Sequence, residues 1–416
     1  MTATTPVEYV EAHRERLVRT ALNLLAVDTQ NPPGETAALA DAVEGRLSDL
    51  GLATERVTAD PAKPNVLASL PGEGDRTLLY EGHLDTVPFD AGEWTRDPLG
   101  ERDGDRIYGR GATDMKGPLA AMLLTAAAYA ETGTTPPVDL SFLFVSDEET
   151  AGDAGLDAVL DERSLAADGC VVGETTCEGG RHSVTVADRG SIWLTLEANG
   201  EGAHGSRPAL GVNAIDRLYD AVERIRAEFG TERLSYPDAL DPIVEESVAF
   251  YEPAMGAEAA RETFASPTIN LGVLEGGESV NAVPERARAE LDVRLTAGVD
   301  TSDTLARIRA CADDCPGVAL TDVSWSVGTY EAVDSPLVTA VADTAAAVTG
   351  ERIYRRSATG GGDAKTLRRA GVPTVEFALG TDTAHAVDEY TTVDALAANA
   401  AVYARVPSVF ADAVGR

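Results

Sequence analysis

A histidine and an aspartate, His83 and Asp85, stand two residues apart where a short apolar stretch of the chain ends. The stretch 77–81 is typical of a buried strand, and Gly82 follows it. In an open α/β sheet, ligands collect beyond the carboxyl ends of the strands. A carboxylate near a histidine also suits metal binding, because an acceptor orients the ring and fixes its tautomer. A lone His-x-Asp pair is more often surface polarity, so a metal site requires further ligands elsewhere in the chain.

Further side chains of metal-binding type follow predicted strands or a glycine-rich loop. The complete set is His83, Asp114, Glu149, Glu174 and His385. Imidazoles and carboxylates without cysteine suit borderline divalent ions, with Zn²⁺ as the first expectation and Co²⁺ or Mn²⁺ as alternatives. Five protein ligands are too many for one catalytic zinc with an open position, but they suit two ions if one carboxylate bridges them.

A second carboxylate, Glu148, directly precedes Glu149. Adjacent carboxylates repel each other, which raises the pKa of at least one of them. If Glu149 binds metal, Glu148 is free to take a proton from a water molecule, which is the general-base role in metal-assisted hydrolysis. The alternative is a solvated acidic turn over 147–149, and the other predicted ligands at strand ends favour the base.

The elements that must position these residues alternate between strand and helix up to about residue 186. Strands are predicted near 77–81, 139–145 and 169–172, and a helix rich in alanine and leucine follows the glycine-punctuated loop 107–117. This alternation predicts an α/β fold with a mostly parallel sheet that carries helices on both faces. The same alternation resumes after Asp300.

The segment between these two parts has a different pattern. Strand-like stretches with one exposed face and one long helical stretch follow each other at 191–199, 213–229, 268–273 and 288–295. This pattern predicts an antiparallel sheet with helices on one face, which is an α+β unit.

The chain is strongly acidic, with 34 lysines and arginines against 69 aspartates and glutamates and a net charge of −35. Such a charge argues against binding to nucleic acid, which requires a basic surface. The only lysines are Lys63, Lys116 and Lys365. An evenly acidic, lysine-poor composition is typical of a salt-accumulating halophile, where salt screens the repulsion between carboxylates. An acidic enzyme of a mesophile is the alternative.

The first residues are polar and acidic and lack the layout of a signal peptide, and no apolar run is long enough for a transmembrane helix. The four cysteines show no disulfide-framework spacing. We therefore expect a cytoplasmic protein without a membrane partner.

Together these segments resemble the M20 family of co-catalytic zinc amidohydrolases, which includes acetylornithine deacetylase, succinyl-diaminopimelate desuccinylase, aminoacylase and carboxypeptidase G relatives. The segments with metal-binding residues are 82–85, 109–117, 147–149, 172–175 and 384–385. Further matching segments are 202–206, 211–214, 276–277, 281–284 and 292–294. The resemblance covers nearly the whole chain.

The resemblance implies a role for each predicted ligand. Asp114 would bridge two ions, and the peptide bond that follows it would be cis. His83 and Glu174 would complete one metal site, and Glu149 and His385 the other.

The resemblance also implies roles for neighbouring residues. Asp85 would orient His83, and Glu148 would be the general base. His204 would stabilise the oxyanion from the smaller domain, often in the other subunit's site; a structural histidine that caps a loop is the alternative.

A third group of residues would bind the carboxylate of the substrate. Arg294 would do so together with Asn281, a task that suits a bidentate guanidinium. Gly360 and Gly361 would contribute backbone N–H groups, although their loop can also be a plain turn. Two departures concern the same side of the site: Thr175 replaces a usual proline, and Gly362 replaces the serine or threonine usual before an aspartate.

The family implies a zinc-exopeptidase-like catalytic domain formed by 1–186 and 299–416, with a lid and dimerisation domain inserted at 187–298. We expect a two-metal deacylase for a small anionic N-acyl amino acid, similar to acetylornithine deacetylase or succinyl-diaminopimelate desuccinylase, and a homodimer that forms through the lid. A dipeptidase or carboxypeptidase with the same site is the alternative enzyme. A metal-dependent binding protein without catalysis is the alternative outside enzymes.

Overall fold

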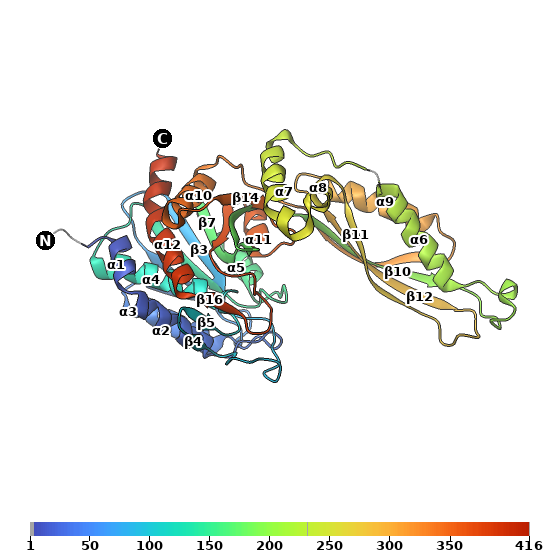
Figure 1. Ribbon diagram of the computed structural model, residues 1–416, viewed down its shortest axis with the longest axis horizontal. Helices are drawn as coiled ribbons and strands as arrows, with labels where there is room; N and C mark the ends of the chain where they lie inside the picture. Colours follow the sequence, from blue (N-terminus) through green and yellow to red (C-terminus); the bar gives the residue numbers. More distant parts are fainter. Residues whose placement is uncertain (1–3, 231, 416) are drawn as a thin grey trace. The chain divides into compact units, whose positions relative to one another are not determined.

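The computed structural model describes residues 4–230 and 232–415, which form two compact units (Figure 1). The first unit comprises the described residues within Met1–Val186, Glu331–Arg356 and Gly361–Arg416. The second unit comprises Ala187–Tyr330 and Ser357–Gly360.

A nine-stranded sheet forms the centre of the first unit. Its strands are β1 (Ala53–Val57), β2 (Asn65–Leu70), β3 (Thr77–His83), β6 (Asp139–Val145), β7 (Gly169–Thr175), β8 (Cys177–Glu178), β9 (Arg181–Ala187), β14 (Ile353–Ser357) and β15 (Thr374–Ala378). They lie in the order β1-β2-β6-β3-β7-β15-β9-β14, and β8 pairs with β9.

Parallel pairing is concentrated in the middle of this sheet. Strand β3 pairs in parallel with β6 on one side and with β7 on the other, and β7 pairs in parallel with β15. The pairs β1–β2, β2–β6, β9–β15 and β8–β9 are antiparallel. The sheet is therefore mixed, not mostly parallel as the sequence predicted, because antiparallel strands flank the parallel centre. The four central strands β6, β3, β7 and β15 all have their carboxyl ends at the same edge.

Helices cover both faces of the sheet, which confirms the predicted α/β class. The helices of this unit are α1 (Pro6–Ala12), α2 (Arg14–Leu25), α3 (Ala37–Asp49), α4 (Lys116–Thr132), α5 (Leu156–Glu162), α10 (Pro336–Thr349), α11 (Asp363–Arg369) and α12 (Val393–Val414). Among the described helices, none combines the length and the apolar character that a membrane span requires.

Neighbouring residues of β3 show the two faces, because successive side chains of a strand point in opposite directions. The hydroxyl of Tyr80 donates to the backbone carbonyl of Tyr403 on α12 at 2.6 Å. Leu79 belongs instead to the hydrophobic cluster that contains Leu156 of α5 and Leu367 of α11. Helix α4 lies on the Tyr80 side, where it contacts α12.

A small antiparallel sheet lies beside these helices. It consists of β4 (Glu101–Asp103), β5 (Arg106–Tyr108) and β16 (Tyr390–Thr392) in the order β16-β5-β4. Tyr390 pairs with Tyr108, so the chain after His385 lies next to the chain that leads to Asp114. This pairing brings two predicted metal-binding loops together although they are distant in the sequence.

The second unit is an antiparallel sheet with helices. Its strands are β10 (Gly190–Asn199), β11 (Thr268–Gly276), β12 (Arg286–Leu295) and β13 (Val318–Ser326), in the order β11-β12-β10-β13. Its helices are α6 (Ala214–Phe229), α7 (Asp241–Met255), α8 (Ala257–Ala265) and α9 (Thr301–Asp313), with short 3₁₀ turns η1 (Pro208–Leu210) and η2 (Asp238–Leu240). Alternate residues of β12, including Leu291 and Val293, form a core with Leu218 of α6 and Ile308 of α9.

The second unit extends further along the chain than the expected boundary at residue 298. It continues to Tyr330 because β13 pairs with β10 over most of its length and α9 contributes to the same core. The pattern after Asp300 resembled the first α/β segment, so its pairing partner was not visible in the sequence.

Candidate metal centre

The predicted metal ligands lie at the carboxyl edge of the central strands. His83 is the last residue of β3, and Glu174 is the next-to-last residue of β7. Glu149 follows β6, and His385 follows β15 in the loop toward β16. Asp114 precedes α4, and the peptide bond between Asp114 and Met115 is cis, which confirms that expectation.

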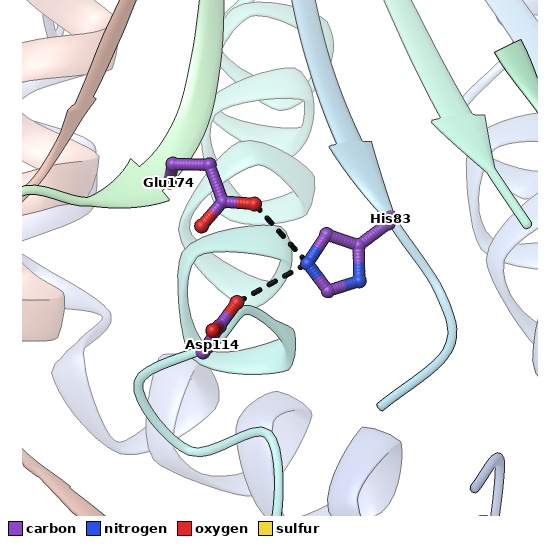
Figure 2. Close-up of side chains that lie close together, drawn as sticks. All are labelled: His83, Asp114 and Glu174. Carbon is purple, nitrogen blue, oxygen red and sulfur yellow. Dashed lines mark hydrogen bonds and ion pairs between the residues drawn. The ribbon is translucent and has the colours of Figure 1, made fainter. Parts of the chain in front are cut away.

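Three of these residues form a first group, shown in Figure 2. The Nε2 atom of His83 lies 3.2 Å from Oδ1 of Asp114 and 3.2 Å from Oε1 of Glu174. His83 is buried, with only 2 % of its side chain exposed. One ligand atom from each residue lies within 4.8 Å of the others, so a single ion would reach all three.

The other oxygen of Asp114 belongs to a second group. Its Oδ2 atom lies 3.0 Å from Nε2 of His385, and the same nitrogen lies 3.3 Å from Oε2 of Glu149. His385 adopts a positive φ of 62°, a conformation that is uncommon for a residue with a side chain. The two groups therefore share Asp114 and no other residue.

The groups around Asp114 have shifted pKa values. Burial opposes ionisation of Asp114, but hydrogen bonds from His385 and His83 outweigh burial and lower its pKa. Burial and the charge of Asp114 raise the pKa of Glu174 to about 8. Hydrogen bonds to Asp114 and Glu149 raise the pKa of His385 to about 10. Imidazole nitrogens and partly buried carboxylates, without thiolates, fit borderline divalent cations, whose charge would offset that of the carboxylates.

Asp85 contacts His83 through its main chain. Its backbone carbonyl lies 2.9 Å from Nδ1 of His83, whereas its nearest carboxylate oxygen is 3.7 Å from the same nitrogen. The carboxylate instead accepts the backbone N–H groups of Glu148 at 3.3 Å and of Glu149 at 3.2 Å. The side chain of Asp85 therefore holds the acidic turn in place, and its carbonyl orients the imidazole.

Asn31 connects Asp85 to the rest of the acidic turn. Its Nδ2 atom donates to Oδ2 of Asp85 at 2.8 Å and to Oδ1 of Asp147 at 2.9 Å. The same atom lies 3.2 Å from the hydroxyl of Thr150. Lys63 forms an ion pair with Asp147. Asn31 is buried, so its amide satisfies carboxylate oxygens that water cannot reach.

The side chain of Glu148 lies close to Gly362, in the loop that connects β14 to α11. A Cβ atom on Gly362 would lie 2.9 Å from Oε1 of Glu148, so a side chain at that position would displace the carboxylate. Burial raises the pKa of Glu148 well above its usual range, and the charges of Asp363, Glu174 and Glu149 act in the same direction. The departure from the family pattern at Gly362 therefore lies directly against the predicted base.

His204 and Asn281 lie close together in the second unit. The backbone of His204 pairs with that of Ala282, and the N–H of Gly205 donates to the carbonyl of Asn281 at 2.6 Å. Nδ1 of His204 lies 2.8 Å from the hydroxyl of Ser206, and the imidazole is exposed. Two predicted functional segments that are distant in sequence thus form one surface of this unit.

Arg294 has a partner on its own strand. Its Nε and Nη2 atoms donate to the two carboxylate oxygens of Asp292 at 2.7 and 3.1 Å, and its guanidinium lies 5.4 Å from the ring centroid of Trp193. Gly360 and Gly361 lie in the loop that connects β14 to α11, where Gly360 belongs to the second unit and Gly361 to the first.

Three residues near the metal ligands had no predicted role. They are Asn31, Arg110 and Glu389. The available signals were weak: Arg110 stands between two glycines ahead of Asp114, and Glu389 follows His385 by four positions. Their hydrogen-bond partners are distant in the chain, so local sequence patterns do not indicate them.

The chain resembles known proteins in sequence over most of its length. Residues 79–408 match peptidase family M20/M25/M40. Succinyl-diaminopimelate desuccinylase of Methylocella silvestris is 30% identical over 415 residues, covering 95% of this chain and 96% of that protein. Acetylornithine deacetylase of Edwardsiella ictaluri is 34% identical over 263 residues, covering 62% of this chain and 61% of that protein.

Solved structures show the same fold at lower identity. An M20 family metallo-carboxypeptidase from Sulfolobus solfataricus has a TM-score of 0.80 and 21% identity, covering 95% of this chain and 99% of that chain. Human carnosine dipeptidase 1 has a TM-score of 0.74 and 17% identity, covering 98% of each chain. With the family match over most of the sequence, the chain belongs to peptidase family M20/M25/M40 and is a hydrolase of that family.

Proposed function

We propose that this chain is a metal-dependent hydrolase that removes the acyl group from a small anionic N-acyl amino acid. The observation that carries the proposal is the arrangement of Asp114, whose two oxygens face two separate groups of ligands. The desuccinylase relative, which matches nearly the whole chain, supports a deacylase. Similarity to succinyl-diaminopimelate desuccinylase and acetylornithine deacetylase favours an N-succinyl or N-acetyl substrate.

In this proposal the chain holds two divalent ions, with Zn²⁺ as the first candidate and Co²⁺ or Mn²⁺ as alternatives. His83 and Glu174 would hold one ion and Glu149 and His385 the other, and Asp114 would contribute to both. When bound, such ions would supply polarisation of the substrate carbonyl group and a lower pKa for water.

Glu148 acts as the general base in this reaction. It accepts a proton from the attacking water and returns the proton to the leaving amine, which a carboxylate next to the reacting atoms can do. Asp85 supports this step because its carboxylate holds the backbone of Glu148. His204 stabilises the negative charge on the oxygen of the tetrahedral species, as a preorganised hydrogen-bond donor does.

The second unit supplies the recognition of the substrate carboxylate in this proposal. Arg294 and Asn281 bind the carboxylate, and the backbone N–H groups of Gly360 and Gly361 complete its surroundings. We also propose that the active form is a homodimer that associates through the second unit and works in a salt-rich cytoplasm, with no nucleic-acid or membrane partner.

A substrate panel tests the proposed reaction. The protein, loaded with Zn²⁺ or Co²⁺ in high salt, is offered N-acetyl and N-succinyl amino acids beside dipeptides. We expect turnover of at least one acyl amino acid with a higher kcat/KM than any dipeptide. Turnover of dipeptides alone would favour the dipeptidase or carboxypeptidase alternative. Tight binding of the panel without turnover would favour a metal-dependent binding protein.

A further inference from the structure

The carboxylate of Glu389 is buried completely and lies against the loop that carries Asp114. Its Oε1 atom accepts three backbone N–H groups, those of Gly111 at 3.1 Å, Thr113 at 2.9 Å and Asp114 at 3.1 Å. A buried carboxylate requires such donors, because the cost of removing it from water is large when it lacks them. The loop that contains Asp114 is therefore wrapped around the side chain of Glu389.

Arg110 connects the same carboxylate to the loop that carries His385. Its Nη1 atom donates to Oε2 of Glu389 at 2.7 Å, and its Nη2 atom donates to the backbone carbonyl of His385 at 3.2 Å. The guanidinium lies 5.4 Å from the ring centroid of Trp94, and only 5 % of Arg110 is exposed. The Arg110–Glu389 ion pair thus contacts the backbone of Asp114, which both groups share. It also contacts the backbone of His385, which belongs to the second group.

The main chain brings these two residues together. The N–H of Gly109 donates to the carbonyl of Glu389 at 3.0 Å, next to the pairing of Tyr108 with Tyr390 between β5 and β16. Gly109 has a φ of +149°, a conformation that residues with a Cβ atom rarely adopt. The chain can therefore turn from β5 into the loop that surrounds Glu389.

We propose that Glu389 and Arg110 are positioning residues that hold the loops of Asp114 and His385 in one arrangement before any ion binds. This inference rests on the proposed function in that Asp114 and His385 are metal ligands. Neither Glu389 nor Arg110 belongs to the two groups of ligand atoms. Both residues contact backbone groups of the ligand loops, and the position of the backbone determines the position of each ligand side chain.

The two residues have separable effects, because each contacts a different loop. Arg110 holds His385, so a change there affects the group with Glu149 and leaves the group with Glu174 intact. Glu389 holds the loop of Asp114, which both groups share. Replacing Glu389 by alanine therefore weakens both groups, whereas Glu389→Gln keeps an oxygen for the backbone N–H groups and loses the ion pair with Arg110.

The first experiment measures Zn²⁺ binding to metal-free protein by competition with a chromophoric chelator. We expect Arg110→Lys and Glu389→Gln each to weaken one ion about 10–100-fold and to leave the other unchanged, the usual effect of removing a residue that supports a ligand. Glu389→Ala should weaken both ions. Arg56→Gln is the matched control, because Arg56 pairs with Asp41 and Glu44 away from the site. Two ions at unchanged affinity in folded Arg110→Lys and Glu389→Gln would overturn the proposal.

The second experiment needs no variant and applies even if the substituted proteins do not fold. Hydrogen exchange is measured in metal-free protein for the backbone N–H groups of Gly111, Thr113 and Asp114. We expect strong protection that rises little when Zn²⁺ is added. Free exchange that becomes slow only with Zn²⁺ would show that the metal orders the loop, and the proposal would then be wrong.

These results are independent of the proposed reaction. A wild-type protein that binds a single ion, or that hydrolyses no acyl amino acid, contradicts the proposed function. The exchange of the three N–H groups in metal-free protein still decides whether Glu389 holds the loop of Asp114. Failure of one proposal can therefore be distinguished from failure of the other.

Discussion

The Oδ2 atom of Asp114 lies 3.0 Å from Nε2 of His385, although one residue precedes α4 and the other follows β15. The opposite oxygen of the same carboxylate faces His83 at 3.2 Å. A carboxylate between two imidazoles is suited to bind two cations at once, because each of its oxygens is directed at a different group. The position of Asp114 is therefore the basis of the proposed two-ion site.

Substitution at this position should change the number of bound ions. We expect Asp114→Asn to lose tight binding of both ions and His385→Ala to lose one, because only Asp114 is common to the two groups. The measurement is metal per chain by elemental analysis after dialysis against Zn²⁺. Asp382→Asn, three positions before His385, serves as a control that should retain two ions. One ion in the wild-type protein would contradict the shared role.

Loss of the proposed base should lower turnover without loss of metal. For Glu148→Gln we expect kcat to fall about 10²–10⁴-fold, the usual contribution of a general base. Metal content should stay at the wild-type level, since Glu148 belongs to neither group of ligands. Glu162→Gln, at an exposed glutamate on α5, should leave kcat unchanged. Wild-type turnover by Glu148→Gln would exclude the proposed mechanism.

Metal binding should become tighter as the pH rises from 6 to 8. The pKa of Glu174 is raised to about 8 and that of His385 to about 10, so both groups carry protons near neutral pH in the metal-free protein. Ligands must lose these protons to bind an ion, and a higher pH favours that loss. Calorimetric titration with Zn²⁺ in buffers of different ionisation enthalpy measures the protons released. The His385→Ala variant should release fewer protons than the wild-type protein. An affinity for Zn²⁺ that does not depend on pH would contradict this account.

Asn31 should support both stability and turnover. Asn31→Ala removes the donor that Asp85 and Asp147 share, and an unsatisfied buried acceptor costs about 1–3 kcal/mol of unfolding free energy. We expect kcat to fall as well, because Asp85 holds the backbone of Glu148. Urea unfolding and steady-state kinetics measure the two effects.

A stability-matched control separates the two effects of Asn31. Ser335→Ala removes the cap of α10, where the Ser335 side chain accepts the N–H of Val338, and should cost about 1 kcal/mol. Its kcat should remain at the wild-type level. If both variants lower stability but neither lowers kcat, Asn31 stabilises the fold without supporting the acidic turn.

Salt should stabilise the protein. With a net charge of −35, repulsion between carboxylates opposes folding, and the screening length falls from about 10 Å at 0.1 M to about 3 Å at 1 M salt. We expect the thermal midpoint, followed by circular dichroism, to rise between 0.1 and 2 M KCl. Full stability and activity in dilute buffer would contradict adaptation to high salt.

The sequence alone predicted the candidate metal ligands and determined the class of the fold. His83, Asp114, Glu149, Glu174 and His385 follow strands or a glycine-rich loop, and parallel strands place their carboxyl ends at one edge. Local periodicity was sufficient for this conclusion, because it depends only on which residues follow which elements.

Only the tertiary structure decided how these residues are supported. The carboxylate of Asp85 accepts backbone N–H groups of the acidic turn, and Asn31 donates a hydrogen bond to the same carboxylate. The ion pair of Glu389 with Arg110 connects two distant loops. The assignment of β13 to the second sheet likewise depends on a strand pairing that local patterns do not specify. The physical reason is the same in each case: a buried polar group takes its partner from whatever segment packs against it, and the chain order of that segment carries no local signal.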